Sequence, residues 1–386
     1  MPGGRTIKLD FGRRLKEQPG VGHNRWHEGL EPVVEVRPGE LLTLDMLDGF
    51  DNQVTPGMSP EQFSSVSFFP NHPMTGPVAV TGAQPGDLLE VEIVDVEPDP
   101  HANYGFTPIA PGFGLLRDRF SDAFIAHWQL CHDGYARSEE IPYVRVPRSP
   151  FLGILGVAPS RQLREHVTRR ESSLLAAGGT VLPPDPREAV PAMEPYASEA
   201  LRTIPPRENG GNLDVKQARV GSRVLLPVFV PGAMFSAGDP HYAQGDGESC
   251  GCAIEMRGRA RLRFRVLEGA AENGPVRNPV VILDAAADAS SLCVVGYCVE
   301  EGKNHSESTT VAARQAVLNL IDILAAAGWS REQAYVICSV AADLRIGQIV
   351  DLPNVGVTAV LPLNIFEEPD RIMRAIGGQT VPLPSR

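Results

Sequence analysis

The first third of the chain alternates hydrophobic and polar positions in short runs that are separated by turn residues. Residues 88–97, LLEVEIVDVE, place hydrophobic side chains on one face and acidic side chains on the other, which is the period of a half-buried strand. Residues 33–36 and 41–47 have similar character and flank a Pro–Gly turn. This part of the chain is therefore predicted to be rich in strands.

Strand character returns in the second half at residues 222–230 and 260–266. The second of these, ARLRFRV, alternates arginines with hydrophobic residues. An arginine stripe is compatible with an anion site, but a solvated strand face is the favoured interpretation.

The clearest helical periodicity comes late in the chain. Within residues 309–327 hydrophobic side chains recur at helical spacing, and Gly328 offers a C-terminal stop. Ser330 and Gln333 form a capping box that predicts a second helix to about Ala342. The fold class is therefore predicted to be mainly β with a few helices, all-β leaning to α+β.

A proline-rich stretch is the best internal boundary. LPPDPREAVPAMEP holds five prolines in fourteen residues and cannot form a regular helix. We expect an N-terminal β-rich part (1–180) with an excursion at 101–150, a linker (181–205), and a C-terminal β-rich part with late helices (206–386). Both parts are expected to form one compact unit.

Composition and charge narrow the class of protein. The 386 residues are 42% hydrophobic and 21% charged, and the formal net charge is −12. This acidic balance argues against nucleic-acid partners and against adhesion to anionic lipid. No apolar run approaches the about 20 residues that span a bilayer, and the N-terminus lacks the apolar core of a signal peptide. The six cysteines form no C-x-x-C pair, so we expect reduced thiols in a cytoplasmic protein.

One glycine-rich segment concentrates candidate chemistry. GDPHYAQGDGES places Asp239 and His241 two residues apart, so that both point the same way on an extended segment. Glu248 follows a Gly-Asp-Gly turn that can fold the chain back. The segment permits two or three ligands around one divalent ion. The alternative is a polar turn with a hydrogen-bonded histidine.

Three other segments carry polar groups in similar settings. PRENGGNLDVKQ holds Asn209, Asn212 and Asp214 around two glycines, although a hairpin turn would use the same residues. Asp48 lies in an acidic segment whose spacing does not fit an EF-hand. His72 lies in a Pro- and Gly-rich loop, where a lone histidine is more often structural than a ligand.

Nucleophilic catalysis has weaker support. Cys250 and Cys252 flank a glycine close to His241, so a cysteine amidase is conceivable. Cys252 leads into a strand-like run, which favours a buried small hydrophobe. GESCG at residues 247–251 has the spacing of G-x-S-x-G but lacks the strand-to-helix frame of a serine elbow. The chain contains no Walker A motif or dinucleotide fingerprint.

Four long motifs resemble the acetamidase/formamidase family. They are HPMTGPVAVTGAQPGDLLEVEI, FLGILGVAPS, PPRENGGNLDVKQ and VPGAMFSAGDPHYAQGDGE, in the order typical of that family. The resemblance runs from about residue 20 to about residue 365. APGFGLLRDRF and AFIAHWQL resemble the longer, formamidase-like members.

The resemblance implies hydrolysis of a small amide to a carboxylate and ammonia, on a β-rich fold. It also implies a metal-bound homo-oligomer. The positions that match the polar motifs of the family are Asp48, His72, Asn209, Asn212, Asp214, Asp239, His241, Gln244, Asp246 and Glu248.

These positions lead to a hypothesis about roles. Asp239 and His241 bind the ion, with Asp214 and His72 as the next candidate ligands. Glu248 is the general base on water, unless it is a ligand. The remaining matched positions are assigned to catalysis (Asp48 and Asn212) and to substrate binding (Asn209, Gln244 and Asp246). Zinc is the first choice of metal, and calcium, magnesium and manganese remain open.

Two alternatives stay open. The enzyme could act on a larger, carbamoyl or cyclic amide, or the chain could be a non-catalytic metal- or ligand-binding protein on the same scaffold. The latter predicts bound metal without release of ammonia from any amide.

Overall fold

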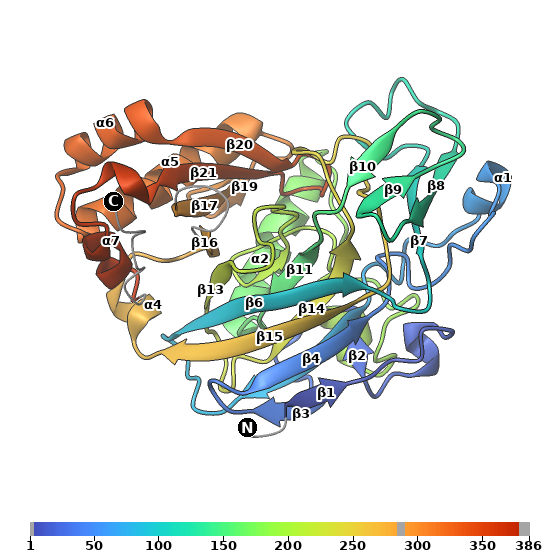
Figure 1. The fold of residues 1–386 in the computed structure, drawn as a ribbon. Coiled ribbons are helices and arrows are strands. Elements are labelled where there is room, and N and C mark those ends of the chain that lie inside the picture. Colours follow the sequence, from blue (N-terminus) through green and yellow to red (C-terminus); the bar gives the residue numbers. More distant parts are fainter. Residues whose placement is uncertain (1–3, 284–289, 378–386) are drawn as a thin grey trace.

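The computed structural model describes residues 4–283 and 290–377, and its elements are mainly strands (Figure 1). The widest sheet has nine strands, in the order β1 (Arg5–Ile7), β4 (Leu41–Met46), β15 (Gly258–Leu267), β6 (Leu88–Pro98), β13 (Arg223–Pro227), β16 (Val280–Leu283), β17 (Ser291–Tyr297), β21 (Gly356–Pro362) and β20 (Asp343–Gln348). All its neighbours pair antiparallel except β1 with β4. The predicted mainly β class is confirmed.

A second sheet of six strands carries the site described below. Its order is β12 (Gly210–Asn212), β11 (Phe151–Gly156), β14 (Phe235–His241), β5 (Met74–Val80) and β2 (Gly22–His23), with β3 (Val34–Val36) also paired to β5. Smaller sheets are formed by β10 (Arg145–Pro147), β9 (Tyr135–Arg137), β8 (Phe124–Leu130) and β7 (Tyr104–Ile109), and by β18 (Val299–Glu300) with β19 (Lys303–Asn304).

The helices are few and mostly late. They are α1 (Pro60–Phe63), α2 (Arg161–Ala176), α3 (Tyr196–Glu199), α4 (Ala270–Asn273), α5 (Thr309–Ala326), α6 (Arg331–Ala341) and α7 (Asp370–Ala375), with 3-10 turns at Leu15–Glu17 and Leu363–Ile365. In the part of the chain that the structure describes, no helix combines the length and hydropathy needed to cross a membrane.

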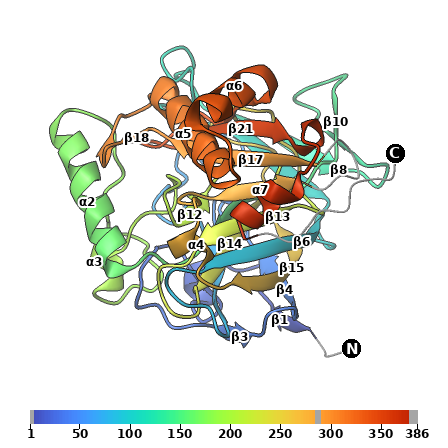
Figure 2. The same ribbon diagram turned by 90° about the vertical axis from the view of Figure 1, so that its left-hand side faces the viewer.

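The main core lies between the two large sheets. Strands β4, β6, β13 and β15 of one sheet and β5, β11 and β14 of the other contribute to one buried cluster. Phe235 of β14 meets Phe264 of β15 edge to face, with ring centroids 5.1 Å apart. A second core forms where α5, α6 and α7 cover β16, β17 and β21, as the turned view shows (Figure 2). Strands β16 and β17 are therefore buried on both faces, between the two cores.

Most of the elements predicted from the sequence are confirmed, usually within one to three residues. The five predicted strands correspond to β3, β4, β6, β13 and β15, and the two predicted helices to α5 and α6. The Ser330–Gln333 capping box closes as expected, because Ser330 Oγ accepts from the backbone N–H of Gln333. The β15 arginines line a solvated face and pair with acidic side chains of β4 and β6.

Two segments hold more structure than the sequence suggested. The excursion at 101–150 contains the whole four-stranded sheet. Helix α2 was not anticipated, because its buried face includes charged side chains that pair with acids elsewhere, such as Arg170 with Glu208. Strands from both sides of residues 181–205 share the nine-stranded sheet, while the division into parts stays a prediction.

Candidate functional site

The site is built on the end of β14. All seven residues of this strand are buried, and its last residues are Asp239, Pro240 and His241. The strand is held by β11 on one side and β5 on the other. Asp239 and His241 therefore project from the middle of a sheet rather than from a loose loop.

His241 lies at the centre of a ring of carboxylates. Its Nε2 atom lies 3.2 Å from Oδ2 of Asp239 and 3.4 Å from Oε2 of Glu255. Its Nδ1 atom lies 3.7 Å from Oδ1 of Asp214. Glu255 reaches the ring because its backbone bridges to both His241 and Phe106.

Gln244 fixes the orientation of the His241 ring. The Nε2 amide of Gln244 donates to the carbonyl oxygens of Asp214 and Gly347, so its Oε1 oxygen faces Nδ1 of His241 at 3.0 Å. An amide oxygen only accepts, and Nδ1 must therefore carry a proton. Nε2 is left to face Asp239 and Glu255, as in a histidine that is oriented for metal binding.

A second group of acids lies on the other side of His241. Asp214, His241 and Glu248 can offer one ligand atom each within 4.8 Å of one another, as can Asp239, His241 and Glu255. Asp351 joins this side, because its Oδ2 accepts from Nδ2 of Asn212 at 3.0 Å. Four carboxylates thus surround one imidazole in a buried volume, and a fifth, that of Asp351, lines the same cavity as Asp239, Glu248 and Glu255.

Burial dominates the ionisation of most of these acids. It raises the pKa of Glu255 to about 7, against the attraction of His241. Burial also raises the pKa of Asp214 to about 6. The pKa values of Glu248 and Asp351 rise well above the ordinary range, through burial first and then through the charge of Asp214.

Asp239 and His241 behave in the opposite way. Burial disfavours the charge on Asp239, but the imidazoles of His241 and His72 outweigh it and lower the Asp239 pKa. Burial opposes the charge on His241, but Glu255 and Asp239 raise its pKa well above 6.5. Positive charge is therefore favoured where His241 Nε2 faces these two acids.

The cluster fits a divalent cation. Among the imidazole and carboxylate groups of the site, four buried atoms have no hydrogen-bond partner in the described part of the chain: Nδ1 of His72, Oδ1 of Asp214, Oδ1 of Asp239 and Nε2 of His241. Buried polar groups are seldom left unpaired, and a metal ion would pair such atoms. Mixed imidazole and carboxylate donors suit zinc and also admit harder cations.

The backbone of the site is strained at three of its acidic residues. Asp214, Asp239 and Glu248 have φ values of 48°, 54° and 46°. Residues other than glycine seldom adopt this left-handed region, and they do so mainly at functional sites where the surroundings hold them.

A small cavity opens onto these groups. It has a volume of about 20 Å³, which is room for about one water molecule. Its polar lining comprises Asn71, His72, Asn212, Asp239, Glu248, Glu255 and Asp351. Its apolar lining comprises Phe50, Phe68, Phe113, Ile204 and Cys252.

Some residues predicted from the sequence lie apart from the described lining of this cavity. Asp48 lines a second cavity of about 180 Å³. Asn209 donates from Nδ2 to the carbonyl oxygen of Val157. Asp246 forms partly exposed ion pairs with Arg345 and Lys216.

Two acidic residues of the site, Glu255 and Asp351, were not predicted from the sequence. Each is a single acidic residue within an apolar run, CAIEM and IVDLP. A lone charge in such a run is seldom buried unless it is paired or functional, and that signal would have found both.

The cysteine alternative loses support. Burial raises the pKa of Cys250 and raises that of Cys252 well above 9. A nucleophilic cysteine needs a lowered pKa, so neither thiol is prepared for attack.

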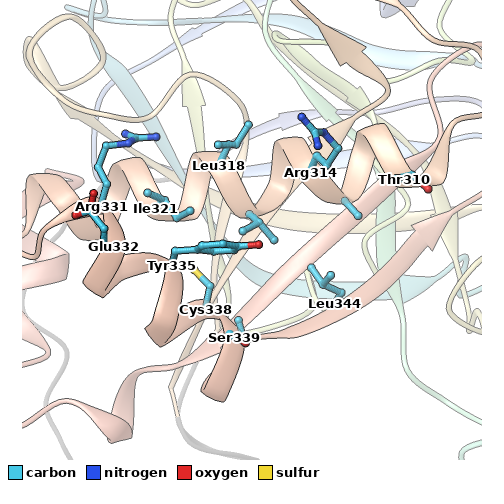
Figure 3. A pocket seen from close by; sticks show the side chains of 13 residues that line it. Thr310, Arg314, Leu318, Ile321, Arg331, Glu332, Tyr335, Cys338, Ser339 and Leu344 are labelled. Atoms are coloured by element: carbon cyan, nitrogen blue, oxygen red, sulfur yellow. The ribbon is translucent and has the colours of Figure 1, made fainter.

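A larger groove of about 750 Å³ lies between α5, α6 and β20 (Figure 3). Ile321 of α5 and Tyr335 of α6 lie next to each other in its lining. Its described lining holds no histidine and a single carboxylate, Glu332. The groove therefore lacks the groups that amide chemistry needs.

Comparisons with known proteins agree with the sequence motifs. The profile of the Acetamidase/Formamidase family matches residues 8–368. A formamidase from Methylophilus methylotrophus is 34% identical over 380 residues, covering 94% of this chain and 93% of that protein. An acetamidase from Mycolicibacterium smegmatis is 34% identical over 362 residues, covering 86% and 88%. The solved structure of a gamma lactamase from Delftia acidovorans has a TM-score of 0.71 and 34% identity, covering 94% of each chain. The chain belongs to the acetamidase/formamidase family.

Proposed function

We propose that this protein hydrolyses a short-chain linear amide, such as formamide or acetamide, to a carboxylate and ammonia, with the help of a bound divalent metal. The observation that carries the proposal is the cavity of about 20 Å³ at which the carboxylates of Asp239, Glu248 and Glu255 meet. The family relatives named formamidase and acetamidase support the same reaction. Zinc is the first choice of metal.

Asp239, His241 and Glu255 would hold the ion, because these three already face one another. When bound, a divalent ion lowers the pKa of water to roughly 7 and polarises a carbonyl oxygen. Through its bond to Nδ1, Gln244 keeps Nε2 of His241 facing Asp239 and Glu255, where it would be available as a ligand. Asp214 and His72 remain candidate ligands.

Glu248 is the proposed proton carrier. Its raised pKa suits a group that takes a proton from the attacking water and returns it to the departing nitrogen. Burial is the main cause of that raised pKa, and like-charge repulsion from Asp214 adds to it. The acid and base steps thus use one carboxyl group.

The asparagines suit recognition of an amide. Oδ1 of Asn71 and Oδ1 of Asn212 are buried and unpaired among the described residues, and both side chains line the cavity. A primary amide carries two N–H donors, which these oxygens can accept. An ester or carboxylate of the same shape would leave the oxygens unpaired, at a cost in binding.

Ammonia release tests the proposal directly. The protein as purified, the chelated protein and the chelated protein with zinc, manganese or magnesium restored are compared on formamide, acetamide and propionamide. Activity that is lost on chelation and restored by metal is expected, and Asp239→Asn should lose both metal and activity. Bound metal without ammonia release from any amide would favour the binding-protein alternative.

A second candidate is hydrolysis of a cyclic amide. The gamma lactamase relative, whose fold is similar over 94% of each chain, favours it. The relatives named formamidase and acetamidase favour the linear amides. Turnover of 2-pyrrolidinone against that of acetamide distinguishes the two.

A further inference from the structure

A second cavity lies next to the small cavity that contains Asp239, Glu248 and Glu255, which is called the catalytic cavity below. The second cavity lies on the side of Phe50. It has a volume of about 180 Å³ against about 20 Å³ for the catalytic cavity. Its described lining comprises Phe11, Gly12, Asp48, Asn52, Val54, Thr55, Pro56, Ala102, Tyr104, Phe106, Met256 and Arg257. It thus has room for several heavy atoms beside a site that holds about one water.

Two segments contribute neighbouring residues to both cavities. Phe50 lines the catalytic cavity, while Asp48 and Asn52 line the second one. Glu255 lines the catalytic cavity, while Met256 lines the second one. Residues 48–52 and 255–256 therefore form a partition between the two spaces.

The ring of Phe50 is the central part of that partition. It meets Phe106, which lines the second cavity, with ring centroids 5.7 Å apart. Phe106 and Glu255 exchange two backbone hydrogen bonds of 3.0 and 2.9 Å, which close the partition beside the ring. Phe50 is 3% exposed, so its ring is held in place by its neighbours.

The partition stands where the acyl chain of an amide must point. Three carboxylates of the cavity lining, Asp239, Glu248 and Glu255, lie around His241, and an amide group must lie beside them to react. The acyl chain then points toward the apolar lining, of which Phe50 and Phe68 form one contact pair with centroids 5.5 Å apart. A chain longer than a methyl or ethyl group would meet the Phe50 ring.

We infer that Phe50 is the specificity-determining residue that limits the substrate to short acyl chains, and that the cavity behind it is an acyl-chain subsite that opens when this ring is removed. The inference rests on the proposed amide hydrolysis. It predicts that longer linear amides become substrates when Phe50 is shortened, with no change to the polar groups around His241.

The test compares kcat/KM for butyramide and acetamide in the full-length metal-loaded protein. Phe50→Leu and Phe50→Ala are expected to raise the butyramide-to-acetamide ratio by about 10-fold or more, since one methylene in an apolar pocket commonly changes kcat/KM by that factor. Phe63→Leu is the matched control. Phe63 is equally buried and packs on Phe50, but it is not among the residues that line either cavity.

A plug in the second cavity should reverse the effect. Ala102→Phe fills the outer space, and in the Phe50→Ala background it is expected to return the ratio toward the wild-type value. Butyrate is not hydrolysed, so its binding shows whether a longer acyl chain can enter the second cavity without any turnover. The binding is measured by the line broadening of the butyrate NMR signals. Phe50→Ala is expected to bind butyrate, and the wild-type protein is expected not to.

The outcomes separate the two proposals. Wild-type protein that releases no ammonia from any amide overturns the proposed function, and the butyrate experiment then still tests the partition. An unchanged ratio and no butyrate binding in folded Phe50→Ala overturn the inference. An equal rise in the ratio for Phe63→Leu also overturns it, because the effect would then come from loosened packing.

Discussion

Gly153 lies so close to Asp239 that a Cβ atom on the glycine would be 2.6 Å from Oδ2 of that carboxylate. The same atom would be 2.6 Å from Oδ1 of Asp214. Strand β11 thus brings bare backbone between two of the buried acids. A hydrogen at this position is what allows both carboxylates to face His241.

Gly153→Ala is therefore expected to displace the Asp239 carboxylate, since a real Cβ does not approach an oxygen to 2.6 Å. The variant should bind metal more weakly and lose at least about 10-fold in kcat/KM, because a displacement of a catalytic group by about 1 Å can lower the rate by about 10²-fold. Metal content and ammonia release measure both effects. Gly20→Ala is the control, since nothing lies within 4 Å of its added Cβ, and a similar loss there would contradict the steric argument.

Removal of the metal is expected to destabilise the protein. The described site gathers four carboxylates around the imidazole of His241, and like charges held together in a buried volume repel one another. A ligand that binds only the folded state stabilises it by about 2.7 kcal/mol at 100 times its Kd. Thermal unfolding with and without chelator should show a lower Tm for the metal-free protein. An unchanged Tm after verified metal loss would argue against an ion in this cluster.

Glu248→Gln separates the two roles open to this residue. If Glu248 carries protons, the variant keeps its metal and loses about 10²-fold or more in kcat. We expect this result, because Asp239, His241 and Glu255 form a complete group without it. Elemental analysis and ammonia release on the same sample provide the measurement. Loss of the metal would instead make Glu248 a ligand.

Local patterns were enough to predict the strands and late helices. The hydrophobic–polar alternation in β6 and β15 arises because each strand has one buried and one solvated face. Consecutive residues are enough to detect this period. Helix α2 was not predicted, because its buried positions include two arginines, Arg164 and Arg170. Their partners, Glu28 and Glu208, come from distant segments of the chain. Periodicity counts hydrophobic residues and cannot recognise a charge that is neutralised by a distant partner.

The site was predictable only where its residues are close in sequence. Asp239, His241 and Glu248 fall within one glycine-rich segment, so their types and spacing suggest a ligand set. Glu255 joins them through a backbone bridge to His241 across a turn, and Asp351 comes from beyond β20. Which acids converge depends on strand pairing, and a single sequence does not encode pairing in any local pattern.

His23 gives the fold a defined sensitivity to acid. It is buried at 2% exposure, and its ring nitrogens contact the carbonyl oxygen of Arg25 and Oγ of Ser236. Burial lowers its pKa from 6.5 to about 4, so the unfolded chain binds a proton between pH 6.5 and 4 and the folded chain does not. Stability from this group is complete above pH 6.5 and falls as the pH drops to about 4.

The loss amounts to about 3 kcal/mol, since one pKa unit corresponds to 1.36 kcal/mol. Urea unfolding at pH 7 and pH 4.5 measures it on wild type and on His23→Gln. The His23→Gln variant should be less stable than wild type at pH 7, because it lacks the imidazole that contacts Arg25 and Ser236. Its stability should fall less on acidification, because glutamine does not bind a proton in this pH range. His101→Gln, at an exposed position, should keep the wild-type difference between the two pH values. Equal losses in wild type and His23→Gln would show that acid sensitivity comes from other groups.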